Sequence, residues 1–116
     1  MSVNNNNNQR KFDPNYKLIE DMVSDSYYPN VQVDKVKSII ESFINFLEEG
    51  VTDLDAIQEK LDQLCYSIND LMDEFEENDS EIETVARESI AETIYYILRW
   101  FNINIDVETA LAEREF

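Results

Sequence analysis

The sequence predicts an all-α protein, a mostly antiparallel bundle of four to five helices, two of them long, with an acidic helix-turn-helix corner. The first observation behind this prediction is the scarcity of turn formers, since the 116-residue chain has one Gly and two Pro. Sandwiches and barrels need turn residues about every 8–12 positions. The second observation is that apolar residues recur at helical spacing through most of the chain. The third is length, because a domain of this size can bury roughly two thirds of its unfolded surface.

The chain divides into a leader and one domain. Residues 1–12 are expected to form a disordered Asn-rich leader, because five consecutive asparagines at 4–8 give too little apolar burial to offset the ordering entropy. Residues 13–116 are expected to form a single helical domain. Its first helix is predicted to be short, from Pro14 to about Val23, with Asp13 as its cap.

A loop is expected at residues 24–30, because Pro29 disfavours helical geometry at Tyr28. Two interpretations of the adjacent tyrosines stay open. Tyr27 and Tyr28 either lie over the mouth of the core with their hydroxyl groups in water, or they form a contact patch.

Two helices follow. One is predicted from Val31 to Glu49, with apolar residues over an arc roughly 160° wide, and it ends at Gly50 in a left-handed cap. The next is predicted at about 53–77, opened by a capping pair of Thr52 and Asp55. Its apolar stripe is only roughly 120° wide, and its opposite face is almost purely anionic.

The fourth helix is predicted to start at a capping box, Ser80 to Glu83, in which Glu83 is one turn from Arg87 and can pair with it. Its apolar face widens toward Trp100, so we expect its second half to lie deepest. Residues 102–104 break it, and Asp106 is expected to cap a last short helix.

The charge balance limits the classes of partner. The net charge is −17, and residues 38–98 hold seventeen Asp or Glu against only Lys60 and Arg87. Such a surface repels nucleic acid and anionic membranes, because Lys and Arg supply the affinity for both. It attracts basic proteins. The sequence therefore predicts a basic protein partner, no nucleic acid and no membrane.

Residue types that are missing exclude further chemistry. The chain has no His, which removes Ser-His and Cys-His nucleophiles and imidazole metal ligands. Cys65 is the one cysteine and lies in an apolar stripe, so it is expected to be a core thiol. No apolar run approaches the ~18 residues of a membrane span and no signal-peptide core is visible, so we expect a cytoplasmic protein.

The carboxylates around residues 70–83, eight in number with no Lys or Arg among them, have three interpretations. A calcium loop is disfavoured, because its sixth position needs glycine and holds Ile82. A magnesium site of the kind used by all-helical nucleotide pyrophosphatases would use acids one turn apart, such as Asp70 with Asp73. These acids face away from the apolar stripe, however, and few cations are present to hold a phosphate. We therefore assign no metal, no other cofactor and no catalytic residue.

The third interpretation is a surface for binding a basic protein. It needs no buried charge, and the helical frame holds the carboxylates in place in advance. We predict a non-enzymatic acidic binding protein, most concretely of an inhibitor or immunity type. The alternatives are the magnesium-dependent enzyme and a small structural protein with a merely solubilising acidic surface. The predicted partner-binding residues are Asp62, Asp70, Asp73, Glu74, Glu77, Asp79, Glu81 and Glu88.

Several segments carry a family resemblance. They are Tyr-Tyr-Pro at 27–29, Val-Asp-Lys-Val-Lys at 33–37, the acidic run at 68–77, and Ser-Glu-Ile-Glu-Thr-Val-Ala-Arg-Glu at 80–88. The chain resembles, over about 25–116, a family of small acidic bacterial proteins of unknown function, and it departs from that pattern at Ser89 and Thr93. The resemblance implies a bacterial origin and a shared fold, and it transfers no catalytic residue.

Overall fold

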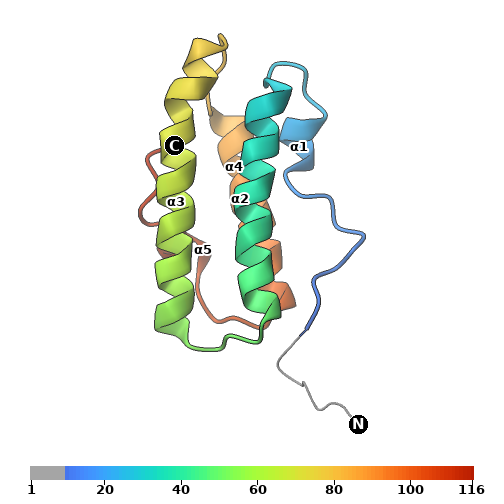
Figure 1. Cartoon of the computed structure of the whole chain (residues 1–116), viewed down its shortest axis with the longest axis vertical. Coiled ribbons are helices and arrows are strands. Elements are labelled where there is room, and N and C mark those ends of the chain that lie inside the picture. Colours follow the sequence, from blue (N-terminus) through green and yellow to red (C-terminus); the bar gives the residue numbers. More distant parts are fainter. Residues whose placement is uncertain (1–9) are drawn as a thin grey trace.

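The computed structural model describes residues 10–116, which contain five helices (Figure 1). No strand occurs within these residues, so the predicted all-α class is confirmed. The helices are α1 (Glu20–Val23), α2 (Asn30–Glu48), α3 (Leu54–Glu77), α4 (Thr84–Trp100) and α5 (Val107–Ala110).

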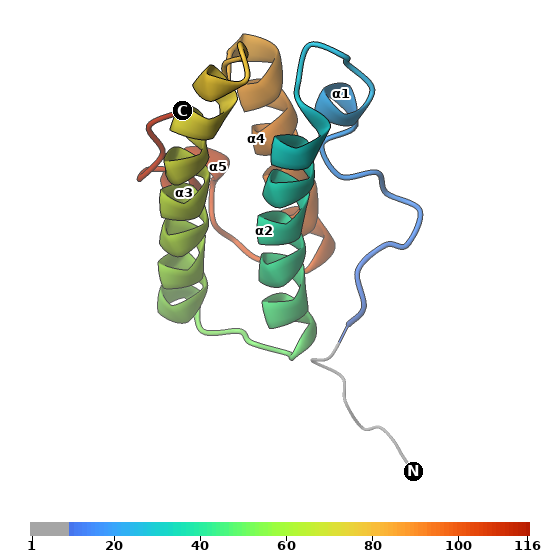
Figure 2. The same ribbon diagram turned by 45° about the horizontal axis from the view of Figure 1, so that its top comes forward.

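The three long helices run in alternating directions. Helices α2 and α3 lie side by side along most of their length, and α4 lies behind α2 (Figures 1 and 2). The short α1 packs on α4 and α2, and the short α5 packs on α3 and α4. The arrangement is an antiparallel bundle in which the end of α3 and the start of α4 meet at one end of the molecule.

The core is one continuous cluster of buried apolar side chains, to which all five helices contribute. Ile40, Phe43, Ile68, Phe75 and Ile94 are at most 1% exposed, and those that share a helix are three or seven residues apart, a spacing that places them on one face. Burial of each such side chain stabilises the fold by about 1.5–3 kcal/mol relative to leaving it in water. None of the helices in the described part of the chain combines the length and the apolar character that a membrane span needs.

Each long helix ends at a residue with a left-handed backbone. These residues are Gly50 at φ 90°, Asp79 at φ 57° and Asn102 at φ 58°. At Asp79 the N–H donates to the Glu76 carbonyl at 3.0 Å, and the Ser80 N–H donates to the Phe75 carbonyl at 2.9 Å. This pair of bonds is a Schellman motif, which satisfies carbonyls that a helix end leaves without partners. The same motif closes α4, and both turns are therefore tight.

The predicted start of the first helix was wrong. Helix α1 begins at Glu20 and has four residues, and Asp13 is not its cap. The Asp13 carboxylate instead accepts hydrogen bonds from the Asn15 N–H at 2.9 Å and from the Tyr96 hydroxyl at 2.7 Å. A distant partner on α4 thus takes the carboxylate that a local cap would use.

Two other predicted caps were also wrong. Asp53, not Thr52, caps α3, with its side chain accepting from the Asp55 N–H at 3.3 Å. Helix α4 starts at Thr84, after Glu83, and not at Ser80. The Ser80 N–H takes part in the motif that closes α3, and within the described residues its buried hydroxyl oxygen accepts no N–H of the next helix.

Residues 10–19, which we call the N-terminal strap, run along the bundle as an extended segment (Figure 1). The Phe12 N–H donates to Glu48 at 2.8 Å, the Trp100 indole N–H donates to the Lys11 carbonyl at 2.8 Å, and the Ile19 N–H donates to Thr93 at 3.1 Å. Packing on the bundle therefore begins before residue 13, the predicted domain boundary. The asparagine run lies outside the described residues.

The strap also changes the environment of α4. Its aromatic side chains pack against those of α4, with the Tyr16 and Tyr96 rings stacked at 4.1 Å. Tyr96 and Trp100, predicted to widen the deepest part of the α4 face, are only half-buried and are covered by this segment. The greatest depth on α4 belongs to aliphatic residues such as Ile90 and Ile94.

Candidate functional site

The predicted partner-binding acids are on the surface. Six are exposed, namely Asp70, Asp73, Glu77, Asp79, Glu81 and Glu88. Asp62 and Glu74 are half-buried. We define the acidic corner as residues 70–83, which comprise the end of α3, the turn and the approach to α4 (Figure 2).

Two of the predicted residues lie apart from the acidic corner. Asp62 is more than two turns earlier on α3 and accepts a hydrogen bond from the Gln58 side chain at 3.0 Å. Gln58 also donates to the Thr109 carbonyl at 3.2 Å, so this cluster belongs to the contact between α3 and α5. Glu88 lies one turn into α4, beside the corner.

The backbone of the acidic corner is held by hydrogen bonds. Besides the motif at Asp79, the Asn78 side-chain amide donates to the Glu74 carbonyl at 2.8 Å. The carboxylates of the last turn of α3 oppose the negative end of the helix dipole, which disfavours that turn. The hydrogen bonds act against that effect, because they satisfy carbonyls at the end of the helix. The backbone positions that carry the carboxylates are therefore held by hydrogen bonds.

Glu74 differs from the other acids because it already has a cationic partner. The Lys35 ammonium on α2 lies 2.6 Å from its carboxylate, and the Gln32 side chain donates to the same oxygen at 3.3 Å. The hydrogen bond from Lys35, followed by that from Gln32, lowers the pKa of Glu74. Glu74 thus links α3 to α2.

The remaining acids of the corner have no ion-pair partner among residues 10–116. Arg87, predicted to pair with Glu83, donates instead to the Thr84 hydroxyl at 3.1 Å. Asp70, Asp73, Glu77, Asp79 and Glu81 therefore form an exposed anionic surface with no cation bonded to it.

One contact of the corner was not predicted. Tyr28 is 2% exposed, and its hydroxyl donates to the Glu83 carboxylate at 3.5 Å. Burial, and then the negative charge of Glu83, raise the pKa of Tyr28 to about 12. The Tyr-Tyr-Pro sequence left open whether these tyrosines lie over the core or form a contact patch, and nothing local connects Tyr28 to a carboxylate 55 residues away.

Exposed apolar side chains lie at the same end of the molecule. Tyr27 is 43% exposed and its ring lies 5.0 Å from that of Tyr28, while Val85 in the first turn of α4 is 44% exposed. The contact of Tyr28 with Glu83 places this pair of tyrosines beside the start of α4. Anionic and apolar surface are thus neighbours here.

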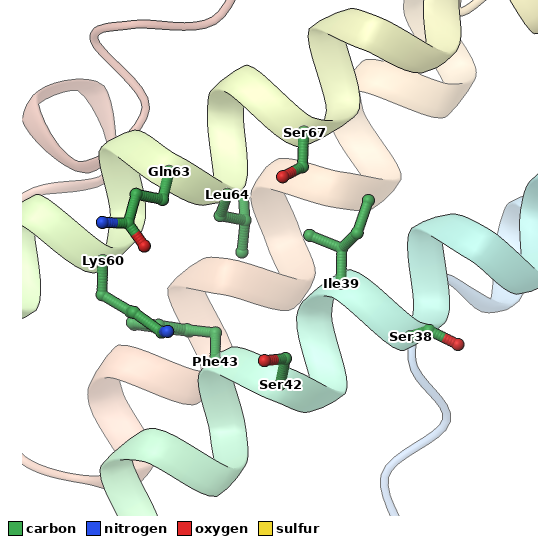
Figure 3. A pocket seen from close by; sticks show the side chains of 8 residues that line it. All are labelled: Ser38, Ile39, Ser42, Phe43, Lys60, Gln63, Leu64 and Ser67. Atoms are coloured by element: carbon green, nitrogen blue, oxygen red, sulfur yellow. The ribbon is translucent and has the colours of Figure 1, made fainter.

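None of the eight predicted acids lines a described cavity. One cavity of about 300 Å³ is a groove between α2 and α3 (Figure 3). Ile39, Phe43 and Leu64 contribute apolar surface to it, and the Lys60 ammonium lies 5.4 Å from the Phe46 ring. A second, of about 390 Å³, lies between the strap and α2.

The described residues offer neither a cluster of metal ligands nor a reactive thiol. Within residues 10–116 no three carboxylate or thiol groups are arranged to hold a metal ion. Cys65 is buried, and burial together with the nearby Asp62 carboxylate raises the pKa of its thiol to about 11. A thiol in this state is a packing group and a poor nucleophile.

Comparison with known proteins places the chain in a family without adding an activity. No curated protein and no solved structure matches it. The family of unknown function DUF5713 matches residues 12–116, which include all five helices and the acidic corner. The chain therefore belongs to this family of unknown function.

Proposed function

We propose that this protein is a non-enzymatic binding protein whose acidic corner engages a basic protein in the cytoplasm, with an inhibitor or immunity role as the concrete form. The observation that carries the proposal is the set of carboxylates from Asp70 to Glu81. Except for Glu74, which pairs with Lys35, they are exposed and have no ion-pair partner in residues 10–116, and they lie on the end of α3 and on the hydrogen-bonded turn that follows it.

Order in the turn favours binding for an entropic reason. A partner that binds a disordered acidic tail loses affinity because the tail loses conformational entropy on binding. Here the Schellman motif and Asn78 already hold the backbone before a partner binds. The net charge of −17 adds a long-range attraction that speeds encounter with cationic proteins at low salt.

The shape of the surface favours a protein over a small substrate. The carboxylates lie at a protruding end of the bundle and outside the described cavities, whereas small-molecule sites are concave. Exposed Tyr27 and Val85 beside them would supply the apolar area that interface centres contain, with the carboxylates as the charged rim.

The test is affinity capture at low salt from an extract of the cell that makes the protein, with a charge-reversed corner. Asp73, Glu77 and Asp79 are changed together to Lys, and Glu74 is left because it holds Lys35. We expect the wild-type protein to retain a basic protein that moderate salt releases, because exposed charges are screened. The corner variant should retain none.

The matched control reverses three exposed acids elsewhere on the bundle, Glu49, Glu59 and Glu92. It has the same net charge as the corner variant and should capture the partner as well as the wild-type protein does. Equal capture by the corner variant would disprove the proposal. Hydrolysis of nucleoside triphosphates in millimolar Mg²⁺ would instead support the enzymatic alternative.

A further inference from the structure

The N-terminal strap forms an arch over one side of α2. Its two ends are fixed by the bonds from Phe12 to Glu48 and from Ile19 to Thr93, and its middle is fixed on the α4 side by stacking of Tyr16 on Tyr96. Toward α2 the arch does not close on the helix. A cavity of about 390 Å³ remains there, near the lower limit of the volumes typical of small-ligand sites.

The walls of this cavity combine three kinds of surface. Phe12 and Tyr16 contribute aromatic rings, Leu18 and Ile44 contribute aliphatic surface, and Asp13, Glu41 and Glu48 contribute carboxylates. No Lys or Arg is among its lining residues, although Lys17 and Lys37 line an adjoining cavity that shares Glu41. The lining is thus both aromatic and anionic.

The carboxylates differ in how far they are already used. Both oxygens of Asp13 accept hydrogen bonds, from Asn15 and Tyr96. Glu48 uses one oxygen, Oε2, for the Phe12 N–H, and Glu41 has no bond within residues 10–116. Glu41 and the second oxygen of Glu48 therefore remain to accept hydrogen bonds from a ligand.

We propose that this cavity binds an organic cation, an alkylammonium or alkylguanidinium group. Rings and carboxylates together are the surroundings that such a group prefers, since the ring face attracts the charge and the carboxylate accepts its N–H bonds. The net charge of the protein favours a cation as well.

The spacing of the free acceptors favours an extended molecule over a bare metal ion. Glu41 and Glu48 are seven residues apart on α2, a rise of about 10 Å, so one small ion cannot bind both. An alkyl chain would lie on Leu18 and Ile44 while its charged head reaches one carboxylate. The site is independent of the proposed function, because it lies toward the end of α2 opposite Lys35 and the acidic corner.

The test is a titration of the full chain with n-butylguanidinium, followed by amide chemical shifts in ¹⁵N–¹H correlation spectra. The neutral n-butylurea, which has a similar shape, is the control ligand. We expect saturable shifts confined to residues 12–18 and 41–48 with the cation, and none with the urea. Equal shifts with both ligands, or shifts spread over the acidic surface, would overturn the proposal.

A double variant, Glu41→Gln with Glu48→Gln, removes the charges and keeps the fold. The amide oxygen of the new side chain at 48 can still accept the Phe12 N–H, so the strap stays anchored. We expect binding at least about tenfold weaker, because charge-assisted bonds become neutral ones. Glu49→Gln with Glu59→Gln, the same charge change outside the cavity, should leave affinity unchanged. Unchanged affinity in the cavity variant would refute the assignment.

The cation could arrive free or as a side chain of a protein. A blocked Gly-Arg-Gly tripeptide separates these sources, because binding within a few fold of n-butylguanidinium means that the cavity admits a protein-borne arginine. Binding of n-butylguanidinium alone assigns the cavity to a free small amine or guanidine. Failure of both probes ends the cavity proposal and leaves the capture experiment on the acidic corner unaffected.

Discussion

Asp79 occupies a backbone position that glycine usually fills. Its φ of 57° is left-handed, and a residue with a Cβ atom pays a steric penalty there, although Asp is among those that tolerate it best. Its charge also lies at the negative end of α3, which is unfavourable for the helix dipole. Asp79 thus carries two penalties, one from its Cβ atom and one from its charge.

Substitution of this residue separates the two penalties. Asp79→Asn removes only the charge and should stabilise the protein by about 0.3–1 kcal/mol. Asp79→Gly also removes a steric penalty of about 1–2 kcal/mol but gives the unfolded chain more freedom, so it should add roughly another 0.5–1 kcal/mol. Urea denaturation of both variants measures the difference. A glycine variant no more stable than the asparagine variant would mean that the turn carries no strain.

Tyr28 makes folding stability sensitive to alkaline pH. Because burial beside Glu83 raises its pKa from 10.0 to about 12, the neutral phenol stabilises the folded state below pH 10. That contribution, of order 2 kcal/mol, is lost as the pH rises from the unfolded value toward the folded one. Tyr28→Phe should flatten the decline in unfolding free energy over that pH range.

The control for this experiment is Tyr27→Phe, which removes the hydroxyl of the exposed neighbouring ring. It should keep the wild-type decline, measured by urea denaturation at several pH values between neutral and about 12. If both variants decline equally, the buried contact with Glu83 does not govern the alkaline behaviour.

At the scale of elements, the strap depends on a single buried hydrogen bond at its second end. Ile19 is fully buried and has a φ of 43°, an unusual geometry for a β-branched residue. Its N–H donates to the Thr93 hydroxyl on α4 at 3.1 Å. This bond and the packing around Ile19 together hold the left-handed backbone and turn the chain into α1.

Thr93→Val keeps the shape of the side chain and leaves the Ile19 N–H without an acceptor. We expect a loss of about 1–3 kcal/mol of stability and faster hydrogen exchange at the Ile19 amide. Thr93→Ser keeps the hydroxyl, so it should retain the slow exchange although it loses a methyl group. Slow exchange in the valine variant would show that this bond does not anchor the strap.

The elements differ in how far the sequence could predict them. Periodic apolar residues were enough for α2 and α3, whose observed bounds lie within one residue of the predicted ones. Helix starts failed at Asp13 and Ser80, because local capping signals lost to tertiary demands on the same groups. The exposure of most of the acids followed from amphipathicity, since a narrow apolar stripe leaves the rest of α3 to solvent.

The contacts of the acidic corner could not be predicted in the same way. Lys35 reaches Glu74 across 39 residues and Tyr28 reaches Glu83 across 55 residues, so both depend on how the helices are arranged. The cavity under the strap has the same origin. Its two aromatic rings and Asp13 come from the strap, and its other two carboxylates, Glu41 and Glu48, come from α2.

At the scale of the whole molecule, the net charge of −17 on 116 residues lowers the stability of the bundle, and the carboxylates of the acidic corner contribute to this loss. Self-repulsion disfavours the compact state, and it is strongest where carboxylates are densest and least compensated. Natural proteins accept such costs at functional sites, where stabilising changes tend to reduce activity. The corner should therefore be the region where removal of charge stabilises most.

The neutral variant Asp73→Asn, Glu77→Gln, Asp79→Asn tests this relation. We expect its Tm to rise by about 4 °C or more, since roughly 1 kcal/mol is regained in a domain of this size, and capture of the basic partner to be lost. The control neutralises Glu49, Glu59 and Glu92, which are exposed and lie outside both proposed sites, and should raise Tm less while capture persists. If both variants raised Tm equally and both still captured the partner, the corner would be an ordinary solubilising surface. Stability would then depend only on the total charge and not on its position.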